Sequence, residues 1–175
     1  MVLRKSYKLT ESNGLNMKAE LKFDEVKEEK VRFLEKTEEI VLATSSDKRV
    51  TARTISYVSE GLTIIFYTLT SFKKFAQIKA NPKVALCLSK LSIEGIAEIL
   101  GNPRKEENKR LLEIFKKKFD WFDWWLVHYP EESVFVKVTP TLIKSFVSKD
   151  DTFFLEYLDL PNKRAYITTE WEKES

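Results

Sequence analysis

The sequence holds a single cysteine, Cys87, so the chain cannot form an internal disulfide. A free thiol fits a reducing compartment, and we therefore expect a cytoplasmic protein. Cys87 lies in the apolar run VALCL, where we expect a small buried hydrophobic side chain rather than a nucleophile.

Long apolar stretches and charge of one sign are also missing. No run approaches the about 20 apolar residues of a membrane-spanning helix, and the N-terminal MVLRKSYKLT lacks the apolar core of a signal peptide. The 30 Lys and Arg residues nearly balance the 27 Asp and Glu residues, for a net charge of +3. That excess is too small to indicate a nucleic-acid-binding surface. We expect neither a membrane nor a nucleic-acid partner, and we predict no metal site.

Glycine is scarce as well, with 4 residues, and no repeat or Gly/Ser-rich linker divides the 175 residues. A chain of this length can bury a core as one domain. We expect a single domain over residues 1–175, in which the polar residues 1–23 form an N-terminal arm.

Short apolar runs typical of strands are abundant. The predicted strands are EIVLATS (39–45), VTARTISYV (50–58), LTIIFYT (62–68), KVALCLS (83–89), SIEGIAEIL (92–100) and VFVKVTPTLIKSFVS (134–148). Pro140 in the last of these indicates an edge or a bulge, and TFFLEYL with RAYIT predicts a final hairpin. Amphipathic patterns predict helices over FDEVKEEKVRFLEK, capped by Asp24, and over 71–80 and 105–119. This pattern favours a mainly β fold, a β-barrel with peripheral helices.

The stretch FYTLTSFKKFAQIKANP (66–82) places two lysines where a helix disfavours them. If Ser71 caps the helix, Lys73 and Lys74 lie in its first turn, where unpaired N–H groups and the macrodipole are already positive. An anion bound there, most simply a phosphate, would account for both lysines, and the hydroxyls of Thr68 and Ser71 would add donors. Alternatively, the lysines merely solvate an exposed helix end.

Arg53 is the second unusual cation. Period-two alternation puts it on the same strand face as Ile55 and Tyr57. An arginine among apolar neighbours needs an anionic partner, either a carboxylate or a ligand. Because a short turn joins this strand to the next, Arg53 and the Lys73–Lys74 pair are expected at one end of a sheet.

Five segments occur in a characteristic order between about Glu39 and Gly101, namely ARTISY, FYT, SFKK, NPKVAL and IEGIAE. In this order and spacing they resemble the pyridoxamine 5′-phosphate oxidase-like, FMN-binding split-barrel superfamily. The resemblance covers roughly a third of the chain. It implies a split β-barrel, FMN as cofactor, and a homodimer with flavin sites at the subunit interface.

The resemblance also implies roles for individual residues. The family's phosphate-binding positions correspond to Arg53, Lys73 and Lys74. The positions that line the isoalloxazine ring and offer backbone hydrogen bonds correspond to Thr54, Ile55 and Ser56. The strand-end and cross-subunit contacts correspond to Tyr67, Thr68 and Ser92. Many members carry a glutamine near the last position, and this chain does not.

The C-terminal segment FFLEYLDLPNKRAYITTEWEKES departs from the family pattern. It lacks the Arg- and His-bearing substrate signature of true pyridoxamine-phosphate oxidases, so we do not expect vitamin B6 oxidation. We expect an oxidoreductase that passes hydride or electrons through flavin N5 between a reduced donor and a small-molecule acceptor. Two alternatives stay open: a non-catalytic flavin-binding or sensing module, and an F420-dependent reductase on the same fold.

The segment WFDWWLVHYP is the densest aromatic stretch and contains the only histidine. Trp121, Trp124 and Trp125 either cover the barrel or form a subunit contact, where aromatic side chains bury large areas, or they form an apolar wall over the flavin. We expect His128 to be a packed or surface residue rather than a proton donor.

Overall fold

The computed structural model describes residues 10–12, 16–149 and 152–169. The strands in these residues are β1 (Thr10–Ser12), β2 (Asn16–Leu21), β3 (Glu39–Ser46), β4 (Arg49–Glu60), β5 (Thr63–Leu69), β6 (Lys83–Leu88), β7 (Leu91–Gly101), β8 (Ser133–Lys149), β9 (Thr152–Asp159) and β10 (Arg164–Thr168). The helices are α1 (Phe23–Glu35), α2 (Lys73–Ala80), α3 (Lys109–Lys118) and α4 (Phe122–His128), and a 3₁₀ turn spans Glu106–Asn108.

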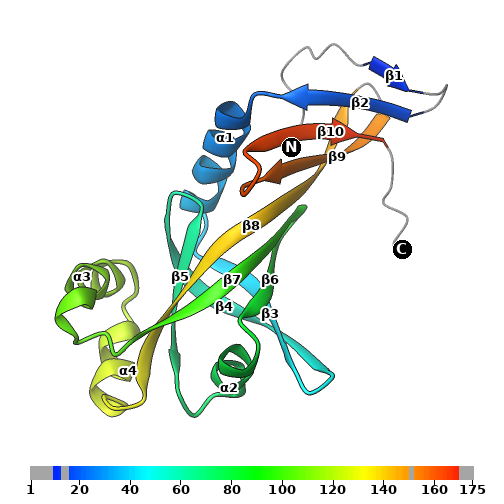
Figure 1. The fold of residues 1–175 in the computed structure, drawn as a ribbon. Coiled ribbons are helices and arrows are strands. Elements are labelled where there is room, and N and C mark those ends of the chain that lie inside the picture. The colour runs from blue at the N-terminus through cyan, green and yellow to red at the C-terminus, as the bar shows by residue number, and fades with distance from the viewer. Residues whose placement is uncertain (1–9, 13–15, 150–151, 170–175) are drawn as a thin grey trace.

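A closed antiparallel barrel forms the centre of the molecule. Its strands follow the order β8–β5–β4–β3–β6–β7, and β7 pairs again with β8 to close the wall (Figure 1). The helices lie outside this wall. The predicted β-barrel with peripheral helices is confirmed, and the predicted barrel strands up to β7 agree with the structure to within one or two residues at each end.

The bulge expected at Pro140 lies where β7 crosses β8. Gly95 pairs with Pro140 while the preceding Glu94 pairs with Leu142, so one β8 residue is skipped. A Cβ on Gly95 would lie 2.8 Å from the carbonyl oxygen of Thr139, which is too close for any other residue. The glycine therefore permits the close approach of two barrel strands.

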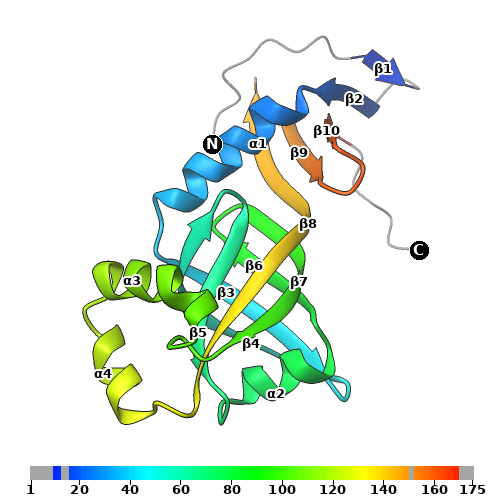
Figure 2. The same ribbon diagram turned by 60° about the vertical axis from the view of Figure 1, so that its left-hand side comes forward.

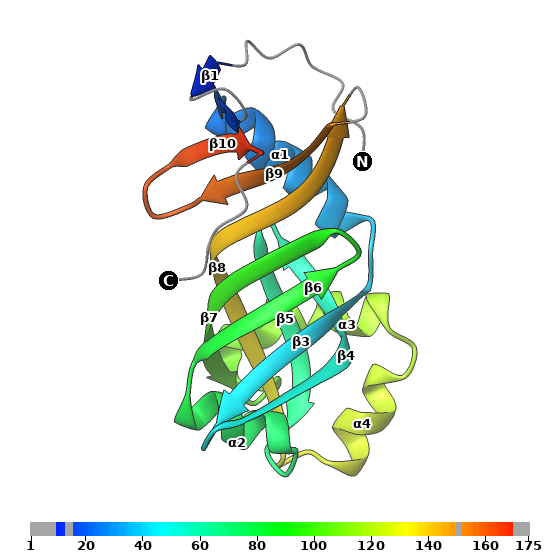
Figure 3. The ribbon, with the colours of Figure 1, turned by 90° about the vertical axis from the view of Figure 1, so that its right-hand side faces the viewer.

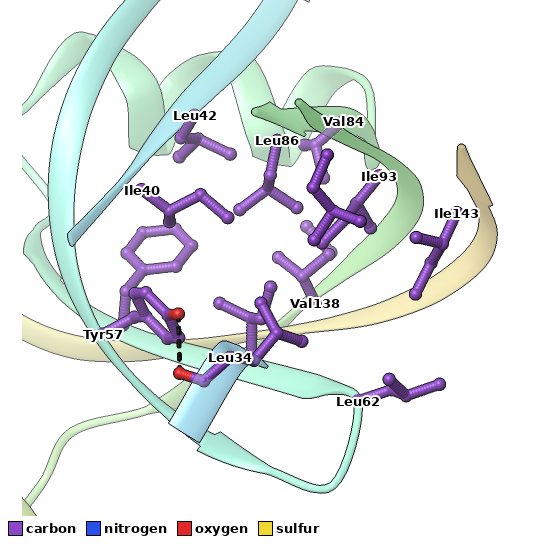
Figure 4. Packing of buried hydrophobic residues seen from close by; sticks show 14 of the residues in the cluster. Leu34, Ile40, Leu42, Tyr57, Leu62, Val84, Leu86, Ile93, Val138 and Ile143 are labelled. Atoms are coloured by element: carbon purple, nitrogen blue, oxygen red, sulfur yellow. Dashed lines mark hydrogen bonds between the residues drawn. The ribbon is translucent and has the colours of Figure 1, made fainter. Parts of the chain in front are cut away.

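Alternating side chains fill the barrel interior. Ile40 and Leu42 from β3 meet Tyr57 and the other inward-facing residues in one apolar cluster (Figure 4). The last turn of α1 closes this core with the fully buried Leu34, whose carbonyl oxygen accepts a hydrogen bond of 2.9 Å from the Tyr57 hydroxyl. A satisfied hydroxyl lets the large ring occupy the core without an unpaired polar atom.

Beyond the barrel, β8 continues into a second layer of strands. β9, β10 and β2 pair in sequence next to it, with α1 beside them (Figure 2). The predicted hairpin of TFFLEYL with RAYIT is confirmed by the β9–β10 pairing. Residues 16–21, assigned to an arm from the sequence, form β2 on this sheet, while residues 1–9 and 13–15 lie outside the described residues.

The outer helices differ in detail from the sequence prediction. α1 begins at Phe23 after Lys22, so Asp24 lies in the first turn and is not the cap. α3 begins at Lys109, because the residues before it form the 3₁₀ turn. The aromatic segment forms a separate helix, α4, and packs with α3 over β5 and β8 in a second cluster of phenylalanines and aliphatic residues. No helix in the described ranges is long and apolar enough to cross a membrane.

Cys87 is exposed, so the prediction of a buried thiol is wrong. Strand β6 alternates, with Val84 and Leu86 directed inward and Ala85 and Cys87 outward. The run looked fully buried because its outward residues are apolar too. Figure 3 shows the face of the barrel formed by β4, β3, β6 and β7, on which Cys87 lies.

Candidate functional site

Helix α2 presents the two lysines as the sequence suggested, but with a different start. The helix begins at Lys73, and its cap residue is Phe72 in extended conformation, without a side-chain cap hydrogen bond. The prediction that Ser71 caps the helix is therefore wrong. Backbone bonds shape the entry instead: the Phe72 amide donates to the carbonyl of Leu69 at 3.1 Å. Lys73 and Lys74 do occupy the first turn, and no acidic residue accompanies them.

Arg53 lies on the inward face of β4 and is held by oxygen atoms of neutral groups. Its Nη1 donates to the carbonyl of Leu42 at 3.3 Å and to Oγ1 of Thr44 at 2.7 Å. Its Nη2 donates to Oγ1 of Thr51 and, at 3.5 Å, to Oε1 of Gln77 on α2. No carboxylate of the described residues forms an ion pair with this guanidinium, so that part of the chain does not neutralise its positive charge.

Lys74 is the lysine that lies with Arg53. Burial, with the positive charge of Arg53 as a second cause, lowers the pKa of Lys74 from 10.5 to about 8. Its ammonium lies 4.4 Å from the centre of the Phe72 ring. Lys73, in contrast, is exposed. The predicted convergence of β4 and the start of α2 is therefore observed for Arg53 and Lys74, which form a local excess of positive charge.

The barrel wall opens beside these cations, between β4 and β5. The two strands pair only from Tyr57–Phe66 to Glu60–Thr63. On its other edge β4 stays paired with β3 across residues 49–56. The Tyr57 amide donates to Glu38 on the β3 side, so by alternation Ile55 also faces β3, whereas Thr54 and Ser56 direct their backbone groups to an edge that pairs with no described strand. Backbone N–H and C=O groups on such an edge are free to bind a ligand.

Thr68 and Tyr67 point to opposite faces of β5. The side chain of Thr68 is buried, and its Oγ1 has no hydrogen-bond partner among the residues that the structure describes. A buried hydroxyl without a partner is uncommon, so Thr68 offers a polar atom with unused hydrogen-bonding capacity. Tyr67 packs outward against α4, where its ring centre lies 5.2 Å from that of Phe122 and its hydroxyl lies 2.9 Å from Oγ of Ser133. Burial raises the pKa of Tyr67 and outweighs the opposite effect of the hydrogen bond to Ser133. The structure thus brings Thr68, but not the Tyr67 ring, to the barrel face that bears Arg53.

Ser92 and Thr54 lie on the exposed outer face of the barrel. Cross-strand register aligns them in one row, through Val41 and Cys87. Ser92 is thus separated from Arg53 by the sheet itself. Within one subunit it does not join the cationic site.

The aromatic segment approaches the site at one point. The Trp125 ring lies edge-on to Phe72, with centres 6.3 Å apart, so α4 contacts the entry to α2. Trp121 packs against Phe119 with ring centres 5.1 Å apart, and Trp124 is 52% exposed. His128 stacks on Trp124 at 4.1 Å, and its Nδ1 lies 2.7 Å from that residue's carbonyl oxygen. His128 is an exposed helix-end residue, in accordance with the expectation of a surface role.

Three polar residues of this site were not identified from the sequence. Thr44, Thr51 and Gln77 surround Arg53, and Gln77 is 1% exposed. A signal for Gln77 was present, since it follows Lys74 by three residues and therefore shares its side of the helix. The two threonines gave no signal, because threonine is common in strands of any function.

An antiparallel barrel that opens between two strands, with a basic helix start beside the opening, defines a split-barrel protein. The model of the family described as pyridoxamine 5′-phosphate oxidase matches residues 26–146. The chain belongs to this family, which confirms the resemblance seen in the sequence. No match is found among curated protein sequences.

Similar solved structures support the fold. One is a pyridoxamine 5′-phosphate oxidase-related, FMN-binding protein from Nostoc punctiforme, with 12% identity, a TM-score of 0.58, and coverage of 85% of this chain and 95% of that one. ChuZ from Campylobacter jejuni has 18% identity and a TM-score of 0.63, and the match covers 81% of this chain and 62% of ChuZ. General Stress Protein 26 from Bacillus anthracis has 23% identity and a TM-score of 0.53, and the match covers 73% of this chain and 96% of that protein.

Proposed function

We propose that this protein binds FMN and serves as a flavin-dependent oxidoreductase for a small-molecule substrate. The observation that carries the proposal is the pair of cations, Arg53 and Lys74, at the start of α2 with no described carboxylate to neutralise them. Positive side chains beside a helix N-terminus, where backbone N–H groups are unpaired and the dipole is positive, favour a phosphate. A neighbour of the same fold is described as FMN-binding, which agrees with this choice of ligand.

The other groups at the opening fit the rest of the cofactor. The unpaired β4 edge at Thr54 and Ser56 offers backbone donors and acceptors to a planar polar ring. The unpaired Oγ1 of Thr68 supplies a further polar contact at the same opening. When bound, FMN supplies hydride and electron transfer at N5, while the chain supplies binding and orientation.

A homodimer completes the proposal. The outer face of β3, β4, β6 and β7 exposes Val41, Val50 and Ile96 at 39%, 70% and 42%, and a hollow on it is lined partly by Ala43 and Ala85. Exposed apolar side chains gathered on one face are typical of a protein interface. A second subunit on this face would cover Thr54 and Ser92, and would place Ser92 near the flavin of its partner.

The experiment that tests the proposal compares FMN with riboflavin, which has the same ring and no phosphate. Titration by fluorescence quenching at fixed salt should show FMN bound on the order of 100-fold more tightly, because charge-assisted hydrogen bonds contribute about 1.5–3 kcal/mol each. Equal affinities would refute the phosphate site. The absorption spectrum and mass of the co-purified cofactor separate FMN from F420, whose phosphodiester could also contact Lys74.

Turnover is tested separately from binding. Reduction of the bound flavin by NADH or NADPH, followed by reoxidation by an added acceptor, is expected of an oxidoreductase. A flavin that stays oxidised with both donors, although it binds tightly, would favour the non-catalytic binding or sensing module.

A further inference from the structure

Gln77 makes hydrogen bonds to several residues beside the cations. It lies on α2 and is buried, with Oε1 accepting hydrogen bonds from Thr44 at 2.8 Å and Thr51 at 2.7 Å. Its Nε2 donates to the carbonyl of Arg49 at 3.2 Å. Because a carbonyl only accepts and a guanidinium only donates, the amide has one orientation, with its oxygen directed to the Arg53 side.

The two threonines bonded to Gln77 also bond to Arg53. Thr44 and Thr51 each accept from one end of the guanidinium, so Gln77, both threonines and Arg53 form one connected network between α2, β3 and β4. Fixing both Nη atoms this way sets the plane of the guanidinium. A carboxylate at the position of Gln77 would also accept from the two threonines, but it would lose the bond to the Arg49 carbonyl and would neutralise the guanidinium.

We propose that Gln77 is a positioning residue for the anion site: it orients Arg53 through neutral hydrogen bonds and so leaves the full positive charge of the guanidinium for a phosphate. The inference rests on the proposed FMN function. In this proposal Gln77 contributes to the selectivity for phosphate, although it does not contact the ligand. Its neutrality, rather than its size, is the property that matters.

Gln77→Glu tests this directly, since it keeps the shape of the side chain and adds a carboxylate beside Arg53. We expect the dissociation constant for FMN to rise by about tenfold or more, while that for riboflavin changes by less than about twofold. Ala76→Glu is the matched control, because it adds the same charge at an exposed position one residue earlier on α2. It should leave the ratio of FMN to riboflavin affinity nearly unchanged.

Other outcomes would overturn the inference. Equal losses of FMN affinity in Gln77→Glu and Ala76→Glu would reduce the effect to general electrostatics. A parallel loss of riboflavin affinity in Gln77→Glu would show that Gln77 only maintains the fold. Equal affinity for both flavins in the unmutated protein would instead refute the phosphate site itself, so the two failures are distinguishable.

A second variant guards against misfolding. Gln77→Met keeps the length of the side chain and removes its hydrogen bonds without adding charge. Provided the thermal unfolding midpoint shows a folded protein, it should lose less FMN affinity than Gln77→Glu, since Arg53 stays charged but is less well oriented. A larger loss in Gln77→Met than in Gln77→Glu would contradict the role assigned to neutrality.

Discussion

The Arg53 guanidinium is held by four oxygen atoms, none of which carries a full negative charge. Burial lowers the pKa of this arginine, but a guanidinium stays charged at any physiological pH. Lys74 lies nearby as a second positive group. Such an arrangement costs stability in the absence of an anion, and ligand binding offsets that cost.

Alanine substitutions should rank the three cations by their contribution to phosphate binding. Arg53→Ala should remove most of the preference for FMN over riboflavin, because it removes a fixed positive charge that no described carboxylate neutralises. Lys74→Ala should remove a smaller part, and Lys73→Ala the least, since Lys73 is exposed. Parallel titrations with both flavins measure the preference. If Lys73→Ala had the largest effect, the phosphate would lie farther out along the helix than Arg53 allows.

The pKa of Lys74 predicts a pH dependence. With a pKa of about 8 in the free protein, the ammonium loses its proton as the pH rises from 7 to 9. A bound phosphate favours the charged form, so FMN binding above pH 8 must take up a proton, and FMN affinity should fall by up to about tenfold per pH unit. The phosphate itself stays a dianion over this range, since its second pKa is about 6.

Two comparisons isolate that effect. Riboflavin affinity should stay flat between pH 7 and 9, and Lys74→Arg should bind FMN with little change over the same range, because arginine does not titrate there. An equal fall in Lys74→Arg and in the unmutated protein would assign the titration to another group.

At the scale of elements, α1 is attached to the strands outside the barrel by a buried ion pair. The ammonium of Lys30 contacts Oε1 of Glu156 on β9, and both side chains are 2% exposed. Removing one member of such a pair leaves an unpaired charge in the interior, which costs about 3–5 kcal/mol of stability, whereas replacing both members by apolar groups costs far less.

Lys30→Met should therefore lower the free energy of unfolding by about 3–5 kcal/mol, and the double variant Lys30→Met with Glu156→Met should recover most of that loss. Urea unfolding followed by circular dichroism measures both. Arg32→Met on the exposed side of α1 is a suitable control, since its ion pair with Glu28 is exposed and contributes about 1 kcal/mol or less. A double variant as unstable as the single one would mean that packing, and not charge, attaches α1.

At the scale of the whole molecule, the exposed apolar face predicts a dimer at micromolar concentration. Val41→Arg on β3 should produce monomers and weaken FMN binding by about tenfold or more, because a flavin site at the interface would lose half of its walls. Light scattering and flavin titration give the two readouts. Val127→Arg on the exposed side of α4 should change neither the oligomeric state nor the FMN affinity.

Two results would contradict this arrangement. An unmutated protein that is monomeric with FMN bound would exclude a cofactor site at the interface. Dissociation by Val127→Arg, with Val41→Arg still dimeric, would move the interface to α4 and its tryptophans.

Much of this architecture was predictable, because strand alternation reports directly on which side chains face a core. The strands and the inward direction of Arg53 follow from it, and the meeting of Arg53 with Lys74 follows from the short turn between β4 and β5. The opening of the wall does not, since nothing in the residues after Phe66 shows that β5 leaves β4 there. The outward residues of β6 are apolar as well, so the strand shows no alternation of polar and apolar residues. For that reason Cys87 was predicted to be buried although it is exposed. Partners such as Gln77 depend on a helix and two strands meeting in space, which local pattern does not encode.

Strand β8 serves both the barrel and the strands beyond it. Leu142 pairs with Glu94 of β7 on one side and with Asp159 of β9 on the other, and Ser145 pairs with Leu91 and Glu156 in the same way. A shared strand leaves no hinge at which one part could melt alone. Heating should therefore give one cooperative transition, and amide hydrogens of β9 and β5 should exchange with deuterium through the same global opening.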